Sequence, residues 1–119
     1  MATLKILLID DLRSFRDLRN ATVARTSAAG LTALNADPEF EWDEIWLDHD
    51  LGLLPEGWPD TIMRVVDYFC EQAFNNSPVK VGVIKIHTSN PVGARQMTTS
   101  LERFGYQVQR VQAEIYFTV

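Results

Sequence analysis

The chain has 119 residues, of which 46% are hydrophobic, and it contains a single cysteine, Cys70. This length and composition predict one globular domain spanning residues 1–119 and exclude an internal disulfide. The formal net charge of −5 argues against an extended nucleic-acid-binding face.

The N-terminal segment lacks the basic stretch and long apolar core that a secretion signal requires. No uninterrupted apolar run approaches the roughly 20 residues needed to span a bilayer. A single cysteine also suits a reducing compartment. We therefore expect a soluble cytoplasmic protein with no membrane partner.

The chain begins with a short aliphatic run, residues 4–9, which ends in the acid pair Asp10 and Asp11. A nearly continuous apolar run is typical of a strand covered on both faces in a parallel sheet. The next strand-like segment is 21–26, and the residues between, 12–20, leave room for a short helix at most. The arginines in this gap have helical spacing and predict a solvated basic face: Arg13, Arg16 and Arg19.

A helix is predicted after the second strand. Ser27 is expected to cap it, Leu31 and Leu34 to face inward, and residues 35–38 to end it. The segment 42–47 then has the apolar character of a central strand.

A loop rich in helix and strand breakers, residues 53–59, follows the central strand. Trp58 in this loop either forms part of a lid or anchors the loop to the core. Asp60 is predicted to cap the next helix, which residues 75–78 end. Its inward stripe is Ile62, Val65, Val66, Phe69, Ala73 and Phe74.

The remaining segments continue the alternation of strand and helix. Residues 79–86 predict a strand, Asn90 and Pro91 predict the start of a helix, and Gly105 predicts its end. The inward stripe of this helix is Met97, Leu101 and Phe104. Residues 106–111 alternate as an edge strand does.

This order predicts an α/β fold with an open, mostly parallel five-stranded sheet and helices on both faces. The tail, 115–119, is a possible extra C-terminal strand. Because the carboxyl ends of parallel strands share one edge of the sheet, the polar residues that follow the strands are expected to meet there. They are Asp10, Asp11, Asp48, His49, Asp50, His87, Thr88, Ser89 and Asn90.

The acids of this edge suggest a metal site. Asp10, Asp11, Asp48 and Asp50 offer hard oxygen ligands for Mg²⁺ or another divalent metal, which neighbouring carboxylates need in order to stay ionised together. The simpler interpretation of the first acid pair is a helix cap beside a solvated neighbour.

The chain has two histidines, His49 and His87, and both follow predicted strands. Beside carboxylates or hydroxyls, an imidazole can exchange protons near neutral pH, so these two and Asp48 are the candidate catalytic residues. The alternative for each histidine is a purely structural role.

The turn at residues 87–93 suggests an anion site. A helix beginning there points the free N–H groups of Val92 and Gly93 toward the same edge, and Arg95 adds positive charge. Capping by Asn90 is compatible with this interpretation. The full set of candidate phosphate-binding residues is Arg13, Thr88, Ser89, Asn90, Val92, Gly93 and Arg95.

Three segments together, residues 9–13, 47–52 and 86–93, resemble the cyclic-phosphate processing receiver domain family, which is distantly similar to response-regulator receivers. The resemblance implies a flavodoxin-like fold. It also implies a role in handling cyclic phosphates, such as those left at broken RNA ends.

Compared with ordinary receivers, the acid pair after the first strand matches the metal-binding acids and Asp48 matches the phospho-accepting aspartate. Thr88 or Ser89 matches the switch hydroxyl. The receiver lysine after the fifth strand is replaced by residues 110–113, Arg-Val-Gln-Ala. This departure favours acid–base chemistry on a phosphate ester over phosphotransfer.

Three functions follow as hypotheses. The first is a phosphoesterase, possessing hydrolase activity toward a cyclic or terminal phosphate of a small ligand, nucleotide or RNA end. The second is a non-catalytic domain that binds or sequesters a phosphorylated ligand. The third is a receiver-type signalling domain phosphorylated on Asp48.

Overall fold

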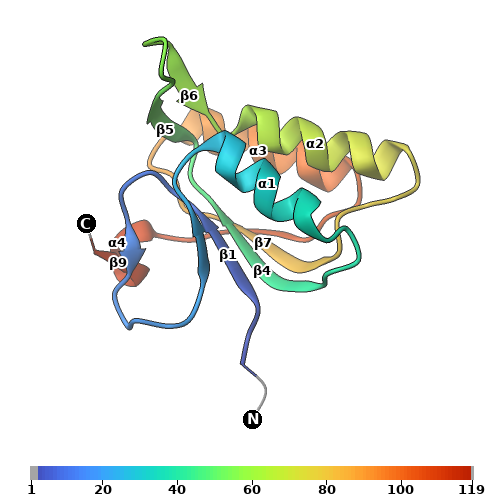
Figure 1. Ribbon diagram of the computed structural model, residues 1–119, viewed down its shortest axis with the longest axis horizontal. Helices are drawn as coiled ribbons and strands as arrows, with labels where there is room; N and C mark the ends of the chain where they lie inside the picture. The colour runs from blue at the N-terminus through green and yellow to red at the C-terminus, as the bar shows by residue number, and fades with distance from the viewer. Residues whose placement is uncertain (1–2, 119) are drawn as a thin grey trace.

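The computed structural model describes residues 3–118 and has an open, five-stranded sheet at its centre (Figure 1). The strands are β1 (Ile6–Ile9), β3 (Thr22–Ala24), β4 (Trp42–Leu47), β7 (Val81–Ile86) and β8 (Val108–Arg110). Their order is β3-β1-β4-β7-β8, and every neighbouring pair is parallel. The predicted flavodoxin-like or receiver-like α/β fold is confirmed.

Strand β1 is buried on both faces, which explains its continuous apolar sequence. All four residues of β1 are buried. Leu7 and Ile9 belong to one hydrophobic cluster, whereas Ile6 and Leu8 belong to a second cluster on the other face. The sheet therefore separates two cores of different composition.

Three helices cover the first face of the sheet: α1 (Ser27–Ala36), α2 (Met63–Phe74) and α3 (Pro91–Arg103) (Figure 1). Their buried apolar residues are Leu34, Val65, Val66, Phe69, Ala94, Met97 and Leu101. Burial of each large side chain contributes about 1.5–3 kcal/mol relative to exposure. Phe74 is an exception to the predicted stripe, since it is the last residue of α2 and is 76% exposed. None of the helices in residues 3–118 is long and apolar enough to cross a membrane.

The second face is covered by a short ribbon and one short helix. Strands β2 (Ser14–Phe15) and β9 (Phe117–Thr118) pair antiparallel, and α4 (Ala113–Tyr116) precedes β9. The short helix predicted in residues 12–20 is wrong, because that segment extends to pair with the C-terminal strand. The extra C-terminal strand exists, but it pairs with β2 and not with the central sheet.

The arginines of the segment 12–20 do not share a helical face, although Arg16 is exposed and Arg13 and Arg19 are only partly buried. Without a helix, Arg19 lies over the Phe15 ring at 4.6 Å and its guanidinium binds Asp17. Arg16 donates a hydrogen bond to the carbonyl of Glu114. These contacts hold the ribbon against the second core.

The loop predicted at residues 53–59 is largely confirmed as the turn of a hairpin, in which residues 54–58 connect β5 (Asp50–Leu53) to β6 (Pro59–Thr61). The hairpin projects from the body of the molecule at the carboxyl edge of the sheet (Figure 1). Gly57 turns it with a φ of +94°. Trp58 is 71% exposed, so it does not anchor this segment to the core.

Two residues predicted to cap helices, Ser27 and Asp60, have other roles in the structure. Thr26 caps α1 through its hydroxyl, and Ser27 is the first helical residue. Asp60 caps no helix of its own. It lies buried in β6 and accepts hydrogen bonds from the N–H and the hydroxyl of Ser27, at 3.0 and 2.6 Å. Asn90 caps α3 as predicted.

Candidate functional site

Three strands deliver one polar residue each to a common point at the carboxyl edge of the sheet. Asp10 follows β1, Asp48 follows β4 and His87 follows β7. One potential ligand atom from each residue lies within 4.8 Å of the other two. The residues are therefore close enough to act as a unit, although 77 positions separate the first from the last.

Asp10 is fully buried and accepts three hydrogen bonds. Its Oδ1 accepts from the backbone N–H groups of Leu12 and Arg13, both at 2.9 Å, and its Oδ2 lies 2.9 Å from His87 Nε2. Burial alone would raise the pKa of Asp10, but these hydrogen bonds outweigh it and lower the pKa to about 2. Asp10 is thus ionised at neutral pH, and it also shapes the loop behind β1.

His87 is held inside the protein by Asp10 and by aromatic rings. Its side chain has no exposed area, and its ring lies 4.6 Å from that of Phe117 on the second core. Its Nδ1 has no hydrogen-bond partner among residues 3–118. A buried polar atom without a partner is uncommon in native proteins and indicates an incomplete polar site.

Asp48 has an environment unlike that of Asp10. It is half-buried and accepts one hydrogen bond, from the N–H of His49 at 2.8 Å. Burial raises its pKa, and the nearby charge of Asp10 raises it further, with His87 opposing. A cation at this point would relieve the repulsion between the two carboxylates.

His49 turns away from this group toward α3 and the hairpin. Its Nδ1 lies 3.0 Å from Asp50 Oδ1 and 3.4 Å from Asn90 Nδ2. Its ring packs directly on Gly93, where a Cβ would collide with it. The two histidines therefore occupy different environments: His87 is enclosed, whereas His49 is paired with Asp50, whose side chain is 68% exposed.

The other predicted metal ligands lie outside the three-residue group. The Asp50 carboxylate is directed to His49 and solvent. Asp11 has an oxygen 3.4 Å from the position that a Cβ on Gly52 would occupy, so its carboxylate faces the start of the hairpin. Burial raises the pKa of Asp11, and the charge of Asp10 adds to this.

A cleft of about 250 Å³ opens beside the buried group. Its wall includes the predicted phosphate-binding residues Arg13, Thr88 and Ser89, and it also includes His87. Arg110, the last residue of β8, lines it too, but was not among the predicted site residues. Its position in the sequence could have indicated this role, because Arg110 takes the place of the receiver lysine at the end of the fifth strand.

The remaining predicted anion donors are less available. The N–H of Gly93 is donated to the side-chain Oδ1 of Asn90 at 3.0 Å, which caps the helix. Arg95 is exposed on α3 and does not line the cleft. A phosphate in the cleft would therefore meet side chains from β7, β8 and the loop after β1, and not the start of α3.

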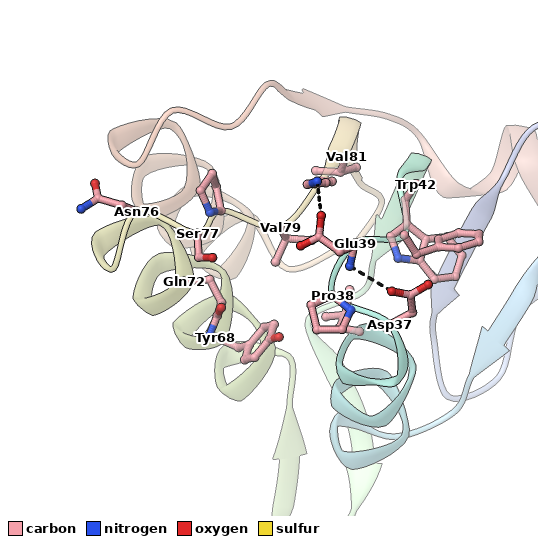
Figure 2. A pocket seen from close by; sticks show the side chains of 14 residues that line it. Asp37, Pro38, Glu39, Trp42, Tyr68, Gln72, Asn76, Ser77, Val79 and Val81 are labelled. Atoms are coloured by element: carbon pink, nitrogen blue, oxygen red, sulfur yellow. Dashed lines mark hydrogen bonds and ion pairs between the residues drawn. The ribbon is translucent and has the colours of Figure 1, made fainter.

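A larger hollow, of about 350 Å³, lies at the opposite, amino-terminal edge of the sheet. Figure 2 shows Asp37 and Glu39 on its wall, with Tyr68 and Gln72 facing them from α2. Asp37 accepts the N–H of Glu39, and the Glu39 carboxylate binds Lys80. With its carboxylates engaged and neither histidine present, this hollow lacks the groups for acid–base chemistry.

The fold and this edge define a receiver-like domain with a modified site. The sequence profile of the cyclic-phosphate processing receiver domain matches residues 5–103, and the chain belongs to that family. The match includes Asp10, Asp48, His49 and His87, whereas Arg110 lies beyond it. Comparisons with curated proteins and with solved structures gave no significant match.

Proposed function

We propose that the protein is a phosphoesterase that acts on a cyclic or terminal phosphate of a nucleotide or RNA end. The observation that supports this proposal is the wall shared by the buried group and the cleft, whose lining carries two arginines and one acid, Glu114. His87 and Arg13 line the cleft, His87 binds Asp10, and Arg13 Nη1 lies 3.9 Å from the same carboxylate. Phosphate-ester hydrolysis requires cationic groups and proton-exchanging groups at one place.

The cleft would hold the phosphate. Arg13 and Arg110 can each present two N–H donors to phosphate oxygens, and a guanidinium suits this bidentate contact better than an ammonium. The hydroxyls of Thr88 and Ser89 add neutral donors. In this proposal Arg110 takes the place of the receiver lysine and holds the phosphate of the ester.

The acid–base step would use His49, which requires that the bound ester extend beyond the cleft toward α3, because His49 does not line the cleft. Its pairing with Asp50 fixes the imidazole tautomer, and its side chain is 12% exposed, so protons can exchange with water. Two roles are open to His87: a second acid–base group, or a fixed member of a cation site with Asp10 and Asp48. The same carboxylates are the proposed site for Mg²⁺ or another divalent metal, which would polarise a phosphoryl oxygen.

The test is turnover of 2′,3′-cyclic nucleotides in the presence of divalent cations, with the phosphomonoester product measured by ³¹P NMR. We expect His49→Ala to lower kcat by roughly 10²–10⁴-fold. Arg110→Gln should mainly raise KM, because it removes a phosphate contact. Arg103→Gln, at the far end of α3, is the matched control and should leave both constants unchanged.

Unchanged turnover in His49→Ala would refute its acid–base role. A second function, ligand binding without chemistry, is favoured by the complete burial of His87, which suits a holding role. Calorimetry that shows tight binding of the cyclic nucleotide, together with no product from the wild-type protein, would establish this second function.

A further inference from the structure

The donor atoms of the buried group have an unusual composition for a magnesium site. Asp10 and Asp48 supply carboxylate oxygens, and His87 supplies an imidazole nitrogen. Mg²⁺ prefers oxygen ligands and retains several waters, whereas imidazole suits first-row transition ions. The acid pair that suggested magnesium in the sequence is also divided, since Asp11 lies outside the group.

The spacing of these donors fits one ion after a small adjustment. Ligands bound at about 2.1 Å lie at most about 4.2 Å apart, and the three candidate atoms already lie within 4.8 Å of one another. Asp10 and His87 are fixed by burial and by their mutual contact. Asp48 is the half-buried member, so a shift of its side chain by under about 1 Å would complete the set.

The charge of the group, which is independent of this spacing, also indicates a missing cation. Two carboxylates are held close together, and the guanidinium of Arg13 reaches Asp10 only at 3.9 Å. The fully buried imidazole of His87 turns its Nε2 toward them, 2.9 Å from Asp10 Oδ2, and so brings a nitrogen donor to the same point. A bound cation would offset the excess negative charge.

We infer that Asp10, Asp48 and His87 form a binding site for a divalent transition ion, Mn²⁺ or Zn²⁺, in preference to Mg²⁺. The inference deepens the proposed function, on which it rests for the role of the ion beside the phosphate cleft. It assigns His87 to ligation and leaves proton exchange to His49.

The test measures ion binding without substrate, so its failure is distinguishable from a failure of catalysis. Tag-free protein is titrated with Mn²⁺, Zn²⁺ and Mg²⁺ by calorimetry. We expect Mn²⁺ and Zn²⁺ to bind at least about tenfold more tightly than Mg²⁺, and His87→Gln to weaken both by at least about tenfold. In that variant the preference over Mg²⁺ should largely disappear.

A spectroscopic measurement identifies the ligand itself. Pulsed electron paramagnetic resonance of bound Mn²⁺ should show coupling to an imidazole ¹⁴N nucleus, which His87→Gln removes. His49→Ala is the matched control, because His49 lies outside the group and contacts Asp48 only through its backbone N–H. Its ¹⁴N coupling and Mn²⁺ affinity should match those of the wild-type protein.

Three results would overturn the inference: Mg²⁺ binding as tight as that of Mn²⁺, ¹⁴N coupling that persists in His87→Gln, or coupling lost in His49→Ala. If His87→Gln fails to fold, Asp48→Asn replaces it, since that residue is half-buried. Unchanged Mn²⁺ affinity in Asp48→Asn would then overturn the inference, and a loss of at least about tenfold would support it.

Discussion

His49 is positioned by the absence of a side chain on its neighbour. Its ring packs on the backbone of Gly93 in α3 while Asp50 and Asn90 contact its Nδ1. Gly93 is fully within the helix and has an ordinary helical backbone, so its requirement is space and not backbone freedom. A single methyl group would therefore displace the imidazole.

We expect Gly93→Ala to lower the free energy of unfolding by about 1–3 kcal/mol, because the added Cβ overpacks this contact. The His49 ring should move, which NMR of its imidazole protons would detect, and any turnover should fall with it. Gln96→Ala, at an exposed position of the same helix, is the control. An unaltered His49 spectrum in Gly93→Ala would contradict this account.

The hairpin β5–β6 is held to the helical face by Asp60. Its carboxylate accepts two hydrogen bonds from Ser27 at the start of α1, and Arg64 also reaches the Ser27 hydroxyl at 3.2 Å. Both Asp60 and Ser27 are buried. The contact joins the projecting hairpin to the first helix, 33 positions earlier in the chain.

Removal of this carboxylate leaves a buried N–H and a buried hydroxyl unpaired. We therefore expect Asp60→Ala to lower the free energy of unfolding by about 2–4 kcal/mol in urea denaturation. Asp67→Ala, on the exposed side of α2, should change it by less than about 0.5 kcal/mol. Equal effects of the two substitutions would show that the Ser27 contact contributes little.

At the level of elements, the sequence predicts the central strands well and the hairpin poorly. Strand β1 is a continuous apolar run buried on both faces, and β4 and β7 each end in apolar residues that are buried. The turn at residues 54–58 was predicted as a loop, but the short strands beside it, β5 and β6, lack an apolar run or a clear alternation, so their pairing was not apparent. The role of Asp60 depends on a contact distant in sequence, and local patterns do not report such contacts.

The candidate site was likewise predicted only in part. The carboxyl-end rule correctly brings Asp10, Asp48 and His87 together, because it depends only on strand direction. It does not predict side-chain orientation. Sequence reasoning therefore could not show that His49 faces α3, that Asp11 turns to the hairpin, or that Arg110 reaches the cleft.

The whole molecule should lose stability at acid pH partly through Asp10. Its pKa falls from the ordinary 3.8 to about 2 on folding, which corresponds to about 2 kcal/mol of stability in the metal-free protein. This contribution is present above about pH 4 and is lost as the pH falls toward about 2, because the unfolded chain binds the proton first.

We expect Asp10→Asn to be less stable than the wild-type protein at neutral pH and to show a shallower decline between about pH 4 and about pH 2. Urea denaturation at several pH values measures both effects. Glu102→Gln, at an exposed position, should reproduce the wild-type slope. A parallel decline in Asp10→Asn would contradict the assignment.

Tyr106 should limit stability at alkaline pH. Burial raises the pKa of its hydroxyl above 10, and the hydroxyl donates to the carbonyl of Phe69 while accepting the N–H of Val79. Its contribution is full below pH 10 and is lost as the pH rises through the folded-state pKa, because the unfolded chain ionises first.

Tyr106→Phe should cost about 1–3 kcal/mol at neutral pH, through the unpaired backbone groups that it leaves. Its stability should nevertheless decline less steeply above pH 10 than that of the wild-type protein. Thermal unfolding followed by circular dichroism tests this, with Tyr68→Phe as the control. A decline as steep as that of the wild-type protein would refute the role of Tyr106.

The ring of Phe117 shields the imidazole of His87, and a two-residue ribbon holds that ring in place. Phe117 lies in β9, which the sheet of β1, β4 and β7 does not include, so the enclosure of the imidazole depends on the pairing of β9 with β2 and not on the central sheet.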